Sequence, residues 1–309
     1  MRAMILAAGL GTRLRPITES LPKSLVPVAG VPNIVRAISV LRGVGIREIV
    51  INTCHLAEIL EDTLGDGARY DVEIAYSREE ELLGTGGGIR KALPLLGEET
   101  FIVVNGDALF VPNIERVLAM HRKKRALATL IVREDSRAEA YGAVGLDGDD
   151  RIRRLVWAGE TERVVRNCIF TGFHVIEPEI SDRLPEMGCI VRETYIPALE
   201  QGVPLFGMTT RAPCFDLGTP KRYLEANIAV VTGKISLDGY NPSREGVHIG
   251  QGVTVGKDCH LGPGVILCDD VSVASGVHLE RVVVLPGGRV ETNLSDVIVL
   301  SNGQLLDAN

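Results

Sequence analysis

The chain has 309 residues, which is enough for about two domains. Hydrophobic residues make up 45% of it and charged residues 24%, so the sequence predicts a folded globular protein and excludes disorder over the whole length. The formal net charge of −7 argues against a dedicated nucleic-acid binder, which normally carries a basic excess.

The sequence also gives no support for membrane insertion or secretion. No apolar run reaches the roughly 18 residues that cross a bilayer. The apolar start, residues 1–9, is too short for a signal peptide and continues directly into a glycine loop. The six cysteines form no C-x-x-C pair and no zinc-finger spacing. We therefore expect a cytoplasmic protein with reduced cysteines, without a membrane or nucleic-acid partner.

The first 232 residues alternate short apolar runs with segments of helical spacing. Gly, Asn and Asp bound the apolar runs, as they usually bound buried strands. The predicted strands are 3–7, 48–52, 72–76, 101–104, 127–132, 169–175 and 203–208, and the predicted helices are 34–44, 87–96, 112–123, 192–201 and 220–231. Pro112 and Pro220 fit the first turn of two helices, where a missing N–H costs nothing. The alternation predicts an α/β layer fold with a mostly parallel sheet.

The pattern changes at about residue 233. Residues 233–245 are rich in Gly, Ser, Asp, Asn and Pro, which indicates a linker. Over 246–301 a small or apolar residue then returns every six positions, with a second apolar series two residues later. The two series are Val247, Val253, Cys259, Val265, Val271, Val277 and Val283, and Ile249, Val255, Leu261, Leu267, Val273, Leu279 and Leu285. A helix needs spacings of three and four, so the period predicts a short left-handed parallel β-helix of hexapeptide repeats.

Three histidines, His248, His260 and His278, lie between the two apolar series and are expected to point outward. His260 and His278 are three hexapeptides apart, so in a three-sided coil they stack on one face. An outward histidine serves some hexapeptide acyltransferases as a base. A surface or subunit-facing histidine is the simpler interpretation, because the repeat region is short.

A glycine loop follows the first predicted strand and carries the sequence A-A-G-L-G-T-R-L-R-P over residues 7–16. Glycines after a strand let backbone N–H groups approach a phosphate. Leu14 stands where a dinucleotide-binding motif requires glycine, and the loop lacks the G-K-[ST] of a Walker A loop. Arg13, Arg15 and Lys23 follow closely, and such a cluster of cations suits a polyphosphate.

The string LAAGLGTRLRPITESLPK, residues 6–23, resembles the signature of sugar-1-phosphate nucleotidyltransferases. The resemblance continues at P-V-A-G-V-P, L-G-T-G-G-G, N-G-D and F-D-L-G-T-P, which begin at residues 27, 83, 105 and 215. A C-terminal hexapeptide domain is also common in that family. The resemblance implies a Rossmann-like mixed sheet over 1–232 and transfer of a nucleotidyl group from a nucleoside triphosphate (NTP) to a sugar 1-phosphate.

The resemblance also implies roles for individual residues. Arg13 and Lys23 are the catalytic cations, Arg13 at the β- and γ-phosphates and Lys23 at the α-phosphate. Asp107 and Asp216 are implied as ligands of Mg²⁺, which prefers carboxylate oxygens together with substrate phosphates. The implied nucleotide-binding residues are Ala7, Ala8, Gly9, Gly11, Thr12, Glu81, Gly84, Thr85, Gly86, Asn105 and Gly106. Independently of the resemblance, Asp107 follows a strand at the edge where ligands of open α/β sheets bind.

The acidic run of residues 79–81 bears on the base that the protein selects. A carboxylate accepts from both N1–H and N2–H of guanine but faces the O4 acceptor of uracil unfavourably. The run resembles the same part of mannose-1-phosphate guanylyltransferases, which implies GTP and mannose 1-phosphate. T-G-G-G-I and K-A-L-P, which begin at residues 85 and 91, instead resemble N-acetylmuramate-1-phosphate uridylyltransferases. A uridylyl- or thymidylyltransferase acting on an N-acetylmuramate- or glucose-type sugar therefore stays open.

The sugar side departs from the family. Many members carry E-K-P near residue 156, where its lysine contacts the sugar phosphate, but this chain has V-W-A-G. Arg153, Arg154 or Arg192 are the candidates to replace that charge. By resemblance the sugar-phosphate residues are Gly142, Thr171, Gly172, Arg192 and Glu193. Two other interpretations also stay open: a silent regulatory subunit that binds nucleotide sugar, and an enzyme with an added acyltransferase activity. A short β-helix exposes its edges, so a homo-oligomer is expected.

Overall fold

The computed structural model describes residues 1–135, 138, 143–237, 240–243 and 245–308, and the chain forms two compact units. Unit 1 comprises Met1–Gly9 and Ala37–Cys214, and unit 2 comprises Leu10–Arg36 and Phe215–Asn309. Residues 10–16 of the glycine loop therefore belong to the same unit as the hexapeptide region. The domain boundaries expected at residues 232 and 246 follow the sequence pattern and stay a prediction. Within the described ranges, no helix is long and apolar enough to cross a membrane.

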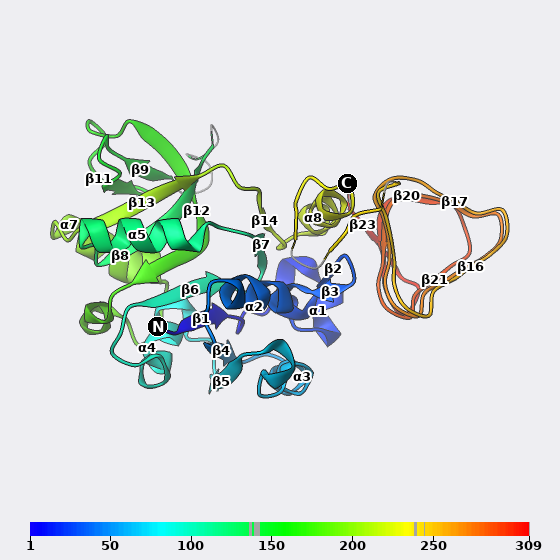
Figure 1. Ribbon diagram of the computed structural model, residues 1–309, viewed down its shortest axis with the longest axis horizontal. Coiled ribbons are helices and arrows are strands. Elements are labelled where there is room, and N and C mark those ends of the chain that lie inside the picture. Colours follow the sequence, from blue (N-terminus) through cyan, green and yellow to red (C-terminus); the bar gives the residue numbers. More distant parts are fainter. Residues whose placement is uncertain (136–137, 139–142, 238–239, 244, 309) are drawn as a thin grey trace. The chain divides into compact units, whose positions relative to one another are not determined.

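Unit 1 is built on one mixed β-sheet (Figure 1). In its described part the strand order is β11-β10-β9-β12-β6-β1-β4-β5, and β8 joins β12 to β13. These strands are β1 (Ala3–Leu6), β4 (Glu48–Thr53), β5 (Glu73–Arg78), β6 (Phe101–Asn105), β8 (Ala128–Glu134), β9 (Val144–Leu146), β10 (Ile152–Leu155), β11 (Ala158–Gly159), β12 (Arg166–Ile176) and β13 (Leu205–Thr210). All seven sequence-predicted strands of this region are present, with ends shifted by a few residues at most.

The direction of the strands corrects the expectation of a mostly parallel sheet. β6, β1, β4 and β5 run parallel, as do β8 and β13. β12 runs antiparallel to its neighbours β6, β8 and β9, and β10 runs antiparallel to its neighbours β9 and β11. The meander from β9 to β12 has short connections, which suit antiparallel strands, whereas the helical crossovers elsewhere produce parallel pairs.

Helices cover this sheet and bury its apolar side chains. They are α2 (Asn33–Gly43), α3 (Ala57–Leu64), α4 (Gly84–Leu96), α5 (Ile114–Lys124) and α7 (Ile196–Glu200), together with the 3₁₀ segments η3 (Ala68–Tyr70) and η4 (Pro178–Arg183) and the π-helical turn η5 (Ile190–Tyr195). Figure 1 shows α5 lying along β8, β12 and β13, which it contacts. α5 begins one residue after its N-cap Asn113, so Pro112 lies outside the first turn, contrary to the sequence prediction.

Unit 2 contains residues 10–16 of the glycine loop, helix α8 (Pro220–Val231) and the β-helix. Its remaining short elements are η1 (Thr12–Leu14), α1 (Ile17–Ser20), η2 (Lys23–Leu25), β2 (Pro27–Val28) and β3 (Val31–Pro32), with β14 (Cys214–Asp216) at its start. Tyr223 of α8 donates from its hydroxyl to the Pro27 carbonyl at 2.6 Å, and Asn227 accepts from the Ala29 N–H at 2.8 Å. Ile235 and Leu237, in the segment expected to be a linker, are buried.

The hexapeptide region is the predicted parallel β-helix, in which the strands of successive turns stack in parallel (Figure 1). Its strands are β15 (Val247–Ile249), β16 (Thr254–Val255), β17 (His260–Leu261), β18 (Val265–Leu267), β19 (Ser272–Val273), β20 (His278–Val284), β21 (Arg289–Val290) and β22 (Leu294–Val299). A last strand, β23 (Leu305–Asp307), pairs antiparallel with β22. His260 pairs in register with His278, and their rings lie 5.7 Å apart, which confirms the predicted stacking.

The strict six-residue period fails in the last part of the coil. Val247 pairs with Val265, but Val265 pairs with Val282, one residue earlier than the period requires. The shift falls at Arg281, which has a φ of +55° and an ion pair with Asp296. Val282 and Val284 therefore fill the coil interior, and the predicted inward positions Val283 and Leu285 are wrong.

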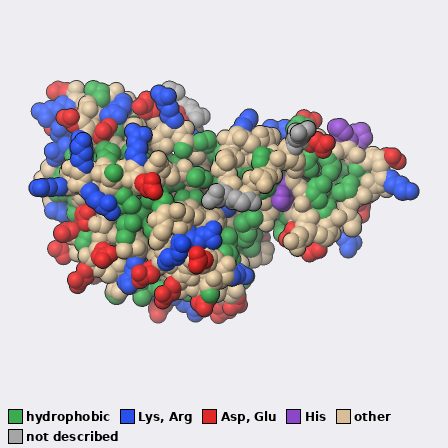
Figure 2. Space-filling model, in the orientation of Figure 1, with side chains coloured by type: hydrophobic (Ala, Val, Ile, Leu, Met, Phe, Trp, Pro, Cys, Tyr) green, Lys and Arg blue, Asp and Glu red, His purple; other side chains and the backbone are tan. Residues whose placement is uncertain are grey.

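The first turn of the coil is more exposed than the turn that follows it. Ile249 and Val255, in the first turn of the coil, are 56% and 41% exposed, whereas their counterparts Leu267 and Val273 are buried. Figure 2 shows hydrophobic side chains gathered on the β-helix. α8 packs against β18, β20 and β22, and the Ile228 side chain of α8 lies against Gly264. One apolar surface of the coil is thus covered from within the unit, while the first turn is open.

Candidate functional site

The glycine loop in unit 2 is folded back on itself by Gly11. Gly11 has a φ of +63°, and its carbonyl accepts from the Leu14 N–H at 2.9 Å and the Thr18 hydroxyl at 2.8 Å. A Cβ at this position would lie 2.9 Å from the Thr18 methyl group, so only glycine fits. The turn leaves Thr12 exposed and the side chain of Arg13 65% exposed at the tip of the loop.

Three cations surround the carboxylate of Asp216. Arg222 contacts its Oδ2 at 2.7 Å, Lys23 contacts its Oδ1 at 3.7 Å, and Arg13 lies 4.0 Å from Oδ2. The Lys23 side chain is only 10% exposed, while that of Asp216 is 41% exposed. One negative charge among three positive charges leaves this cluster net positive, which suits a polyphosphate.

Local structure explains how Asp216 reaches these cations. Asp216 ends β14, and Thr219 then caps α8 by accepting from the Arg222 N–H. A Cβ at Gly218 would meet Asp216 Oδ1 at 2.7 Å and the Arg13 guanidinium at 2.8 Å. Gly218 thus permits the close approach, and neither it nor Arg222 was expected from the sequence. The signal that could have revealed Arg222 is its place in the first turn of the helix that follows F-D-L-G-T-P.

In unit 1, Glu79 is the buried member of the acidic run. Its Oε1 accepts from the Asn52 side-chain amide at 2.7 Å, and its Oε2 accepts from the Leu83 N–H at 3.0 Å. Asn52 in turn accepts from the Ala7 N–H at 2.8 Å, so the first strand is bonded through Asn52 and Glu79 to the segment before α4. Glu81 is exposed. Ala8 is buried, while Gly9 is exposed.

The glycines at the start of α4 allow close packing against residues 185–190. A Cβ at Gly84 would lie 2.5 Å from the Gly188 carbonyl oxygen, and one at Gly86 would lie 2.8 Å from the Pro185 ring. The Gly86 N–H donates to the Gly188 carbonyl at 2.8 Å, and the Thr85 hydroxyl accepts from the Ile190 N–H at 2.9 Å. This packing accounts for the glycines without a ligand, and their contact with a nucleotide stays a prediction.

The N-G-D motif lies beside a β-bulge of β12. The Gly106 N–H donates to the Leu6 carbonyl at 2.9 Å, and Asp107 follows the end of β6 and is half-buried. A Cβ at Gly172, which has a φ of +80°, would lie 2.5 Å from the Asn105 amide nitrogen. The Thr171 hydroxyl donates to the Ile131 carbonyl at 2.8 Å within the bulge. The structure therefore brings Thr171 and Gly172 next to Asn105.

The remaining residues predicted for the sugar phosphate lie on η5 or outside the described residues. Glu193 accepts from the Cys189 N–H at 2.7 Å and so closes the start of η5. Arg192 is exposed on the same turn. Gly142 lies outside the described residues. Arg153 is paired with Asp147 at 2.7 Å, and Arg154 donates to the Asn167 side chain at 2.9 Å.

The carboxylates suit a divalent cation that is completed by the substrate. Within the described residues, no group of three or more His, Cys, Asp or Glu side chains forms a site that could hold a metal ion. Mg²⁺ is commonly bound by one or two carboxylates plus substrate phosphates and water. Asp216 offers a partly exposed carboxylate among phosphate-binding cations, and Asp107 offers one after β6. The donor chemistry of both therefore fits Mg²⁺.

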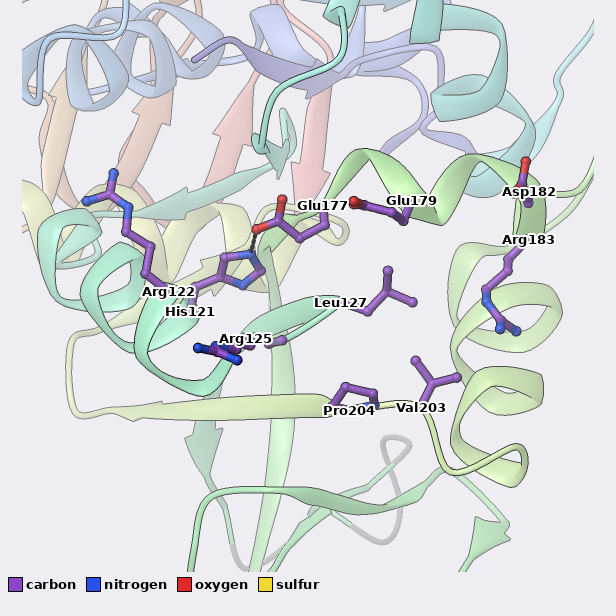
Figure 3. Close-up of a pocket in the computed structure, with 11 residues that line it drawn as sticks. His121, Arg122, Arg125, Leu127, Glu177, Glu179, Asp182, Arg183, Val203 and Pro204 are labelled. Carbon is purple, nitrogen blue, oxygen red and sulfur yellow. Dashed lines mark hydrogen bonds and ion pairs between the residues drawn. The ribbon is translucent and has the colours of Figure 1, made fainter.

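A cavity of about 880 Å³ elsewhere in unit 1 is lined by His121, Arg122, Glu177 and Arg183, among others (Figure 3). His121 contacts Glu177 at 2.8 Å and Thr129 at 2.8 Å. Burial lowers the pKa of His121, against the raising effect of Glu177. The acidic and the arginine side chains that line the cavity are equal in number, so the cavity has no strong excess of either charge. None of the described residues predicted for the site lines this cavity.

Comparison with known proteins agrees with this geometry. Residues 2–232 match the Nucleotidyl transferase family, and residues 246–281 match the Bacterial transferase hexapeptide (six repeats) family, which accords with a left-handed β-helix. The chain is 31% identical over 300 residues to a mannose-1-phosphate guanylyltransferase of Mycobacterium tuberculosis, covering 90% of this chain and 83% of that protein. It is also 31% identical over 274 residues to a UTP–glucose-1-phosphate uridylyltransferase of Synechocystis, covering 83% of this chain and 69% of that protein.

A solved structure shows the same fold. The crystal structure of a putative glucose-1-phosphate thymidylyltransferase from Bacillus anthracis, in complex with a sucrose, superposes with a TM-score of 0.64 at 23% identity. The match covers 74% of this chain and 94% of that one. With the family match over three quarters of its length and the order of its motifs, this chain belongs to the sugar-1-phosphate nucleotidyltransferase family.

Proposed function

We propose that this protein is an active, Mg²⁺-dependent nucleotidyltransferase that converts GTP and mannose 1-phosphate into GDP-mannose and pyrophosphate. The observation that carries the proposal is the cluster of Arg13, Lys23 and Arg222 around Asp216. A silent relative would have no reason to keep a phosphate-binding loop, a buried lysine and a metal-ligating carboxylate in contact. The cysteines are all free thiols, which suits a cytoplasmic enzyme.

The reaction needs charge neutralisation more than proton transfer. The second pKa of a phosphate monoester is about 6, so the attacking oxygen of the sugar phosphate is already ionised at neutral pH. That oxygen forms a bond to the α-phosphorus of the NTP, and the bond from this phosphorus to the oxygen bridging to the β-phosphate breaks. Lys23 and Arg13 stabilise the charge on the α-phosphate and on the departing pyrophosphate. Asp107 and Asp216 are the residues that would hold Mg²⁺, which when bound would supply further charge neutralisation of the phosphates.

Glu81 is the residue that we propose reads guanine. Both carboxylate oxygens of Glu79 already accept hydrogen bonds from Asn52 and Leu83, whereas Glu81 is exposed next to the glycine segment. A carboxylate paired to N1–H and N2–H contributes about 1.5–3 kcal/mol, which corresponds to roughly a 10- to 100-fold preference over UTP. The guanylyltransferase relatives support this base.

Glu81→Gln is expected to reduce the ratio of kcat/KM for GTP to that for UTP by roughly 10- to 100-fold, because the amide cannot accept both guanine hydrogen bonds. The dependence on Mg²⁺ should not change. Pyrophosphate release with each NTP measures the ratio, and Glu80→Gln, at the adjacent exposed position, is the matched control. Use of UTP or dTTP by the wild type at least as well as GTP would contradict the guanine assignment.

That outcome would favour a second candidate, a uridylyl- or thymidylyltransferase acting on a glucose- or N-acetylmuramate-type sugar 1-phosphate. The specific support is the Synechocystis uridylyltransferase, which is as similar in identity as the guanylyltransferase. The cation cluster around Asp216 would bind the phosphates and not the base, so it would serve either nucleotide.

We also propose that the enzyme is a homo-oligomer assembled through the open first turn of the β-helix. Ile249→Lys together with Val255→Lys is expected to lower the particle mass, because these exposed apolar side chains would then carry charge at the contact. Size-exclusion chromatography with light scattering measures the mass. Thr254→Lys, at an exposed position of the same turn, is the control. An unchanged mass in the double variant would show that the first turn does not build the assembly.

A further inference from the structure

Trp157, the one tryptophan of the chain, is exposed by a strained turn. Its side chain is 69% exposed and lies between β10 and β11. The preceding Val156 has a φ of +56°, a conformation that is a genuine outlier for a β-branched residue. The Val156 N–H donates to the Ala143 carbonyl at 2.8 Å, which holds the turn. Backbone strain that presents a large apolar ring to solvent is typical of a ligand contact.

The guanidinium of Arg192 lies over the ring of Trp157. The Arg192 Cζ atom lies 5.7 Å from the ring centroid, within the range of a cation–π contact. Arg192 belongs to the π-helical turn η5, and π-turns occur frequently at functional sites. Stacking fixes the plane of the guanidinium and leaves its N–H edge able to bind a phosphate in bidentate fashion.

Arg192 differs in this respect from the other two cations considered for the missing lysine. Arg153 donates from its Nε to the Asp147 carboxylate, and Arg154 donates from an Nη to the Asn167 side-chain oxygen, so each side chain is held by a polar partner. Arg192 is exposed and stacks on an aromatic ring. Among these three described arginines, it is the one held in an orientation that suits an added anion.

η5 also connects this pair to the segment at the start of α4. The Ile190 N–H, at the first residue of η5, donates to the Thr85 hydroxyl at 2.9 Å, and the Gly86 N–H donates to the Gly188 carbonyl at 2.8 Å. The stacked pair is therefore fixed, within unit 1, to the L-G-T-G-G-G segment that the family signature assigns to the nucleotide.

We propose that Trp157 and Arg192 together form the subsite for the sugar 1-phosphate, in place of the lysine that this chain lacks. Arg192 binds the phosphate, and the indole packs against the apolar C–H face of the sugar ring. The proposal rests on the proposed function, since it supplies the second substrate of that reaction.

Tryptophan fluorescence tests the subsite without relying on turnover. Because Trp157 is the one tryptophan, all tryptophan emission reports on this position. Titration with mannose 1-phosphate, or with whichever sugar 1-phosphate the enzyme turns over, is expected to change the emission saturably. Mannose and inorganic phosphate, each carrying half of the recognised groups, should saturate only at concentrations at least about tenfold higher. Unchanged emission at saturating sugar 1-phosphate in an active enzyme would overturn the proposal.

Kinetics of variants provide the second readout. Trp157→Ala and Arg192→Gln are each expected to raise KM for the sugar 1-phosphate by about 10- to 100-fold while leaving KM for the NTP within about twofold. Arg192→Lys should recover only part of the loss, because an ammonium lacks the planar fork. Arg163→Gln, at another exposed arginine, is the control.

The failures of the two proposals are distinguishable. A wild type that turns over no NTP and sugar 1-phosphate pair, yet shows saturable emission changes, contradicts the proposed function and leaves the subsite in place. An active wild type whose KM for the sugar 1-phosphate is unchanged in both Trp157→Ala and Arg192→Gln contradicts the subsite alone.

Discussion

Asp216→Ala and Asp107→Ala are each expected to reduce kcat by about a thousandfold or more, since each removes a carboxylate that we propose holds Mg²⁺ and metal binding contributes several kcal/mol to the transition state. Asp216→Ala has a second consequence. Arg222 loses its 2.7 Å contact and Lys23 its 3.7 Å contact with this carboxylate. Pyrophosphate release measures kcat for each variant.

The loss should reflect chemistry rather than unfolding. Both carboxylates are at least partly exposed, so we expect the melting temperature and circular dichroism spectrum of each variant to stay close to those of the wild type. Asp62→Ala, which removes an exposed carboxylate within α3, is the matched control and should retain full activity. Near-normal turnover in either variant would refute the metal assignment of that residue.

Lys23→Gln is expected to lower kcat/KM for the NTP by about a hundredfold or more, the effect seen when a preorganised group that stabilises transition-state charge is removed. Lys23 is suited to this role because its side chain is 10% exposed and its ammonium lies 3.7 Å from Asp216 Oδ1. KM for the sugar 1-phosphate should change little. Steady-state kinetics with one substrate varied at a time separates the two effects.

Lys221→Gln is the matched control for this variant, because Lys221 is an exposed lysine on the first turn of α8. Lys23→Arg should recover little activity, since a larger guanidinium does not fit the buried position. Full activity of Lys23→Gln would remove the lysine from the mechanism and leave Arg13 and Arg222 to bind the phosphates.

The elements with strong apolar patterns could be predicted from the sequence, and those without them could not. The strands around β1 and the β-helix combine buried apolar residues with a clear period. α3 was missed because only Leu60 and Leu64 of its eight residues are buried, and one pair at a spacing of four is too little to establish a helical period. The predicted helix 192–201 is instead the π-turn η5 followed by α7, with Pro197 in the first turn of α7.

In the candidate site, too, some residues could be predicted from the sequence and others could not. Motif resemblance identifies Arg13, Lys23 and Asp216, and these residues lie together in unit 2. It could not show that Glu79 is buried and bonded, because that burial accompanies a hydrogen bond from Asn52, which is far away in sequence. Nor could it identify Trp157 as the partner of Arg192, since that contact depends on the left-handed turn at Val156.

Because we propose an active enzyme, the most direct measurement is of both products of the full reaction. Purified protein is incubated with Mg²⁺, each of the four NTPs and several sugar 1-phosphates, and pyrophosphate and nucleotide sugar are quantified together. Equimolar pyrophosphate and nucleotide sugar, formed only when both substrates and metal are present, is the predicted result. Binding of a nucleotide sugar with no pyrophosphate formed from any pair would contradict it and identify the chain as a silent regulatory subunit.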